Sequence, residues 1–135
     1  MIQQIEINLA VHSRGFHLIT EEILRQIELP DAGIMNVFIK HTSASLTINE
    51  NFDSTVLDDF ETVFNLMVPE DMPYYTHTVE GSDDMPAHIK SSLTDSSINI
   101  PISEGRLNLG EWQGIYLCEF RNKARSRKLV ITIYS

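Results

Sequence analysis

The sequence predicts an α+β fold, built mainly on antiparallel sheet with two or three packed helices. Segments with a two-residue hydrophobic period outnumber those with a helical period. The helical patterns fall in the first two thirds of the chain, and the last third consists of strand patterns separated by short turns. Short connections favour antiparallel pairing, because a parallel pair needs a long crossover. The 135 residues suit one domain, to which we assign residues 1–135.

The first part of the chain predicts strands around one short helix. Alternating apolar residues indicate a strand over residues 2–10. Thr20 is a suitable N-cap for a helix, which would end by Pro30. Strand-forming residues then dominate residues 34–39 and 43–49, as two strands or one bent strand.

The middle of the chain predicts two helices. Apolar residues recur every three or four positions between Asp53 and Met67, which is typical of an amphipathic helix. A shorter helix is expected from Pro86, which suits a first helical turn, to about Leu93. Beyond it we expect four short strands, at residues 97–102, 105–109, 114–120 and 127–134.

Composition and charge exclude several classes of function. The formal net charge of -9 opposes the phosphates of nucleic acids and anionic lipids, so we expect neither a nucleic-acid nor a membrane partner. We see no targeting leader and no apolar run of membrane-spanning length, and therefore expect a cytoplasmic location. The single cysteine, Cys118, lies in an alternating strand pattern that predicts a buried thiol rather than a nucleophile.

Two histidines flank an acidic loop. His77 precedes Glu80, Asp83 and Asp84, and His88 follows on the side of the predicted helix that faces away from the core. Neutral imidazoles and carboxylates suit a divalent ion, and they equally suit general acid and base chemistry. The simpler interpretation is that one of the two aspartates only caps the helix that follows.

A polar row lies in the strand pattern that follows His41. Strand alternation places four uncharged polar residues on one face: Ser43, Ser45, Thr47 and Asn49. This face meets water, binds a polar ligand or contacts another subunit. In the second case, His41 would be a third imidazole for the same site.

Two later segments are also candidates for ligand contacts. Trp112 and Gln113 lie in a glycine-flanked turn, where the indole covers the edge of the core or stacks on a ligand. Residues 121–128 carry five of the ten basic side chains. A solvated hairpin tip is the simpler interpretation of this run, and a local anion-binding site is the functional one.

Together these segments resemble the YjbQ-like family, whose members have been credited with a secondary thiamine-phosphate synthase activity. The resemblance covers nearly the whole chain and is carried by residues 41–51, 77–93, 97–120 and 127–133. It implies a YjbQ-like fold and a homotrimer with sites near subunit boundaries. The reaction joins a pyrimidine diphosphate to a thiazole phosphate, so the resemblance also implies a small phosphorylated ligand.

The resemblance points to particular residues. Polar positions of the family fall on His41, His77, Glu80, Asp84 and His88, which we predict to be catalytic. Others fall on Asn49, Glu50, Trp112 and Gln113, which we predict to bind the ligand. A divalent ion, zinc, magnesium or manganese, would be bound by His41, His77 and His88. The alternative is a non-catalytic binding or assembly protein whose histidine loop forms the subunit interface.

Overall fold

The computed structural model describes residues 1–135 and contains eight strands and three helices. The strands are β1 (Ile2–Asn8), β2 (Gly15–Leu18), β3 (Ala32–Ile39), β4 (Ala44–Glu50), β5 (Ser97–Ser103), β6 (Arg106–Leu107), β7 (Gln113–Glu119) and β8 (Lys128–Tyr134). The helices are α1 (Thr20–Leu24), α2 (Thr55–Met67) and α3 (Asp84–Leu93). The predicted α+β class is confirmed.

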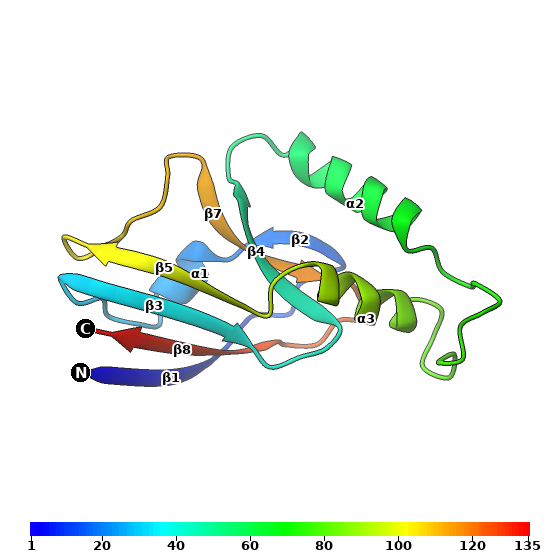
Figure 1. Ribbon diagram of the computed structural model, residues 1–135, viewed down its shortest axis with the longest axis horizontal. Coiled ribbons are helices and arrows are strands. Elements are labelled where there is room, and N and C mark those ends of the chain that lie inside the picture. Colours follow the sequence, from blue (N-terminus) through cyan, green and yellow to red (C-terminus); the bar gives the residue numbers. More distant parts are fainter.

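The strands form two sheets in which every pairing is antiparallel. One sheet has five strands in the order β1-β8-β3-β5-β6, and the other has three in the order β2-β7-β4. In Figure 1 the two chain ends lie side by side at one end of the larger sheet, and α3 lies beside β4. The loop between α2 and α3 extends at the opposite end of the molecule.

The main core lies between the two sheets and contains 17 buried residues. Strand alternation supplies most of them, as in β5, where Ile98, Ile100 and Ile102 are buried while the residues between them are exposed. Pairing sets Ile100 opposite Met35 of β3, so the buried side chains of neighbouring strands face the same side. Each such burial contributes about 1.5–3 kcal/mol to folding.

The structure revises several elements of the sequence prediction. α1 ends at Leu24, and its N-cap residue is Ile19 rather than the predicted Thr20. Residues 34–39 and 43–49 belong to two separate strands in different sheets rather than to one bent strand. β2 is an additional strand, and its four residues are too few to show a clear period. The strand predicted at 105–109 is only the two-residue β6. α3 begins at Asp84, two residues before the predicted start.

Two apolar surfaces are exposed in the single chain. None of the residues of α2 is buried, and Val63, Leu66 and Met67 are largely exposed. The outer face of the larger sheet carries a row formed by Ile2, Tyr134 and Ile34 in register. No helix combines the length and the apolar character needed to cross a membrane.

Candidate functional site

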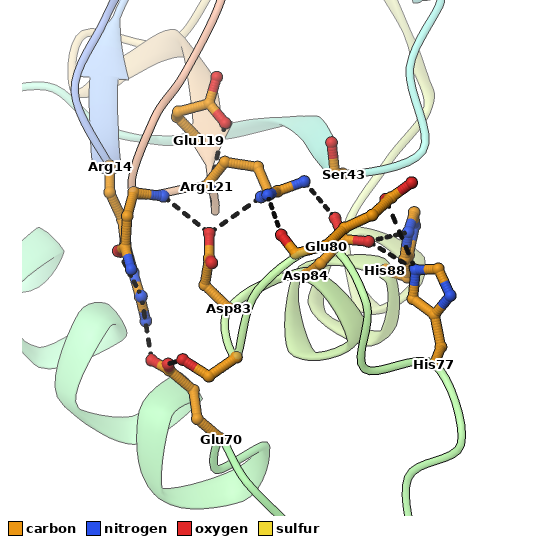
Figure 2. A network of polar contacts seen from close by, with 12 residues as sticks. Arg14, Ser43, Glu70, His77, Glu80, Asp83, Asp84, His88, Glu119 and Arg121 are labelled. Atoms are coloured by element: carbon orange, nitrogen blue, oxygen red, sulfur yellow. Dashed lines mark hydrogen bonds and ion pairs between the residues drawn. The ribbon is translucent and has the colours of Figure 1, made fainter.

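The candidate site lies where the loop between α2 and α3 meets the start of β4 and the end of β7 (Figure 2). Asp84 is the first residue of α3, and His88 follows one helical turn later, so the two side chains share one helix face. His77 comes from the loop. In Figure 2 both imidazole rings point toward the carboxylate of Asp84.

His77, Asp84 and His88 form a compact group of metal-ligating types. Nε2 of His77 lies 2.6 Å from Oδ2 of Asp84, and Nε2 of His88 lies 3.2 Å from the same oxygen. One ligand atom from each residue lies within 4.8 Å of the other two. Ligands bound tetrahedrally at about 2.0–2.1 Å would be roughly 3.3 Å apart. Small side-chain movements would therefore accommodate an ion.

Two hydrogen-bond contacts fix the orientation of the His88 ring. Nδ1 lies 2.9 Å from the carbonyl oxygen of Thr42, which can only accept, so Nδ1 carries the proton. In a neutral ring Nε2 is then unprotonated, yet it faces the carboxylate of Asp84. Two acceptors face each other there, and this contact needs either a second proton or a cation. A ring N–H held by a carbonyl is also the usual second contact of a metal-bound histidine.

Arg121 holds the acidic side of the site in place. Its Nε donates to Asp83 at 2.9 Å, its Nη1 donates to Asp84, and its Nη2 donates to the carbonyl oxygen of Glu80 at 2.9 Å. Asp84 is only 1% exposed, so this pairing places a positive charge beside a buried carboxylate. Sequence reasoning missed this role, because Arg121 lies 37 residues after Asp84 and belongs to the basic run.

Both aspartates are carboxylates at neutral pH. Burial by itself would raise the pKa of Asp84, but hydrogen bonding from His77 and the charge of Arg121 outweigh it, so the pKa is lowered. Burial opposes the same shift in Asp83, where hydrogen bonds from Asn122 and Arg121 hold the pKa below its ordinary value. Asp83 occupies the N-cap position, but α3 has no side-chain capping bond. The predicted capping hydrogen bond is therefore absent, although Asp84 does lie in the first turn of α3, where the helix dipole favours a carboxylate.

Glu80 lies at the edge of this group. Its Oε2 is 3.7 Å from Nε2 of His77, and its side chain is 62% exposed. Glu80 also lines a pocket of about 520 Å³ that contains no hydrophobic residue. The other lining residues are Ser43, Arg121, Lys123, Arg125 and Arg127.

His41 does not join the other two histidines within one chain. Its Nε2 accepts the backbone N–H of Lys128 at 2.8 Å, which occupies the lone pair that a metal would need. Its Nδ1 faces the guanidinium of Arg127 at 3.4 Å. Burial, followed by the charge of Arg127, lowers the pKa of His41. The ring is thus engaged with β8, and its predicted catalytic and metal-binding roles have no counterpart in the single-chain cluster.

The predicted ligand-binding residues gather at the other end of β4. Register pairs Glu50 with Gln113 there, while Ala44 pairs with Glu119 beside the histidines. The six residue steps of β4 separate the two ends by roughly 20 Å. Trp112 is half exposed and packs against Phe52 with ring centroids 5.2 Å apart. Asn49, Glu50, Trp112 and Gln113 therefore form a second group, apart from the cluster.

The polar row of β4 is not simply a solvated face. Ser45 is buried and shares a hydrogen bond with Thr94. Ser43 accepts a hydrogen bond from Arg127 at 3.2 Å. Cys118, opposite Ser45 on β7, is fully buried, and burial raises its pKa to about 12. The prediction of an inert core thiol is confirmed.

Comparison with known proteins gives the chain a family. The sequence profile described as "UPF0047 protein YjbQ-like" matches residues 3–135. UPF0047 protein YjbQ of Escherichia coli O157:H7 is 46% identical over 136 residues, which cover 98% of each chain. A crystal structure of a conserved hypothetical protein from Thermus thermophilus is 29% identical, with a TM-score of 0.86 over 96% of this chain and 99% of the other.

A second crystal structure, of an uncharacterized conserved protein of the YjbQ/UPF0047 family from Clostridium acetobutylicum, is similar over 98% of this chain and 99% of the other. It is 35% identical, with a TM-score of 0.78. Sequence and fold thus agree along almost the entire length. The chain belongs to the UPF0047 YjbQ-like family.

Proposed function

We propose that the protein is a small metal-dependent enzyme in which His77, Asp84 and His88 bind a divalent ion. The substrate would be a small phosphorylated molecule, and thiamine-phosphate synthesis is the reaction that the family resemblance implies. The observation that carries this proposal is the orientation of His88. Its Nδ1 donates to the carbonyl oxygen of Thr42, while its Nε2 faces the carboxylate of Asp84. That second contact requires either a second proton on the ring or a cation, and a bound divalent ion would supply the cation.

The ligand types favour zinc or manganese over magnesium. Two imidazole nitrogens and one carboxylate oxygen suit the former ions, whereas magnesium prefers oxygen ligands and retains several waters. When bound, such an ion supplies Lewis acidity and stabilises negative charge on a departing diphosphate.

The chain itself would supply orientation and proton transfer. Arg121 fixes the carboxylate of Asp84, and Thr42 fixes the ring of His88. Glu80 is the exposed carboxylate nearest the cluster, and its geometry supports a role as a general base or as an additional ligand. His41 would position Arg127 and the start of β8 rather than bind the ion.

The active protein would be a homotrimer. We call the end of β4 where Glu50 pairs with Gln113 the tryptophan end. In one chain it lies about 20 Å from the histidine cluster, too far to contact the same small ligand. Trp112 could then stack on the substrate only from a neighbouring copy. The exposed row of Ile2, Ile34 and Tyr134 on the outer sheet face supports such an association.

Metal binding is tested by thermal unfolding after removal of metal with a chelator. At an ion concentration 1,000 times the Kd, binding stabilises the folded state by about 4 kcal/mol, an increase in Tm on the order of 10 °C. We expect this shift with zinc or manganese, and its loss in His88→Ala and His77→Ala. The control His17→Ala removes a histidine of β2 and should retain it. An unchanged Tm of the native protein with both ions would overturn the proposal.

The alternative is a non-catalytic assembly protein whose histidine loop forms a subunit seam. This alternative is supported by the side chain of His77, which is 43% exposed in the single chain and accessible to a neighbouring copy. In that case His77→Ala and His88→Ala would dissociate the oligomer in size-exclusion experiments. Intact oligomers that have lost the metal-dependent shift would instead support the enzyme.

A further inference from the structure

We infer that the pocket lined by Ser43, Glu80, Arg121, Lys123, Arg125 and Arg127, here called the basic pocket, binds a phosphate or diphosphate group. The inference deepens the proposed function and rests on it for the nature of the complete ligand, because Glu80 borders both the pocket and the histidine cluster. The pocket can nevertheless be tested without a metal.

The lining of the pocket selects for charge. Four of its six residues are basic, one is acidic and none is hydrophobic, in a chain whose net charge is -9. Pockets for organic ligands are lined mainly by apolar side chains. A volume of about 520 Å³ without such a lining suits a small anion or the charged end of a larger ligand.

Two of the four basic side chains are already held by hydrogen bonds within the chain. Arg127 binds both oxygens of the buried Glu119 at 2.7 and 2.6 Å, and also contacts Ser43. Arg121 uses three N–H groups for Asp83, Asp84 and the Glu80 carbonyl. A guanidinium has five N–H groups, so Arg121 keeps two for a ligand.

The other two cations have no partner within the chain. Lys123 and Arg125 are exposed, and neither forms an ion pair or a side-chain hydrogen bond. Lys provides a mobile point charge, and Arg provides a fork that matches two phosphate oxygens. Together they would bind an anion that also contacts Arg121 and Arg127.

Glu80 predicts coupling between the anion and the metal. Glu80 borders the pocket, and its negative charge would repel a phosphate bound there. A cation at the adjacent histidine cluster would offset this charge, so each ligand should increase the affinity for the other. Replacing the carboxylate with an amide should raise phosphate affinity in metal-free protein.

The test is calorimetric titration of metal-free protein with pyrophosphate and with inorganic phosphate. We expect saturable binding that weakens at least about tenfold in Lys123→Gln/Arg125→Gln and strengthens in Glu80→Gln. The control Arg25→Gln/Arg106→Gln removes an equal number of positive charges, from exposed positions outside the pocket. It should bind as the native protein does. Equal binding by the test and control variants would overturn the inference, as would equally tight binding of glutarate.

The pocket and the metal site fail in different ways. If His88→Ala binds pyrophosphate normally but shows no metal-dependent Tm shift, both assignments are supported. If the native protein binds pyrophosphate but neither zinc nor manganese, the basic pocket remains and the metal-dependent function is wrong. If it binds metal but no phosphate at low ionic strength, the present inference is wrong.

Discussion

The two ends of the β4–β7 pair differ in how their polar side chains are held. At the histidine end, where Ala44 pairs with Glu119, the charged groups are fixed by side-chain contacts. Arg121 and Arg127 bind buried carboxylates there. At the tryptophan end, Gln113 accepts the backbone N–H of Gly110 and Asn49 accepts that of Glu50. Trp112 contacts another exposed ring. The first end is preorganised within one chain, whereas the second leaves side chains exposed that are accessible to a neighbouring copy.

This contrast has a physical basis. A buried carboxylate is stable only when paired, so the histidine end must be organised as the chain folds. An exposed indole and amide remain hydrated and need no partner for the chain to fold. A site that uses both ends is complete only after association.

Removing Arg121 should produce the largest effect on stability. Arg121→Met leaves Asp83 and Asp84 buried without their cation, and we expect the free energy of unfolding to fall by about 3–5 kcal/mol. Urea denaturation measures the loss. Arg125→Met, which removes an exposed unpaired cation, should change it by less than about 0.5 kcal/mol. A loss below about 1 kcal/mol for Arg121→Met would show that this end is not held by its ion pairs.

Lowering the pH should have the second-largest effect on stability, by destabilising the histidine end. The lowered pKa of Asp83 means that its contribution to stability is complete above about pH 4, the unfolded-state value, and is lost as pH falls through the folded pKa. The stability gap between the native protein and Asp83→Asn should therefore narrow between pH 5 and pH 2 in urea titrations. A constant gap for Asp83→Asn would contradict the ion-pair account.

The tryptophan end should show the smallest change in stability. We expect Trp112→Ala to lower the free energy of unfolding by less than about 1 kcal/mol, because the ring is half exposed and rests on the exposed Phe52. The same variant should lose oligomer or ligand affinity, measured by sedimentation and titration. Phe52→Ala serves as the neighbouring control. A loss above about 2 kcal/mol would place Trp112 in the structural core of the chain.

The histidine cluster shows where prediction from sequence succeeded. The loop between His77 and His88 was predicted to bring both rings to a carboxylate, and both lie beside Asp84. Asp84 was expected to precede the helix, but it is the first residue of α3 and therefore shares a face with His88. His77 was predicted beside them because only a short loop separates it from α3. His41 was predicted to join them, but its ring bonds to β8, a contact across 87 residues that no local pattern reveals.

Local periodicity was sufficient for the fold class, for most strands and for α2, because alternation and helical spacing record which side of each segment is buried. Tertiary structure decided which strands share a sheet, that Arg121 pairs with the acidic loop, and that Trp112 and the histidines lie at opposite ends of β4. These features depend on contacts between residues distant in the chain. Such contacts form only when the core brings the segments together, and so they leave no periodic signal in the sequence.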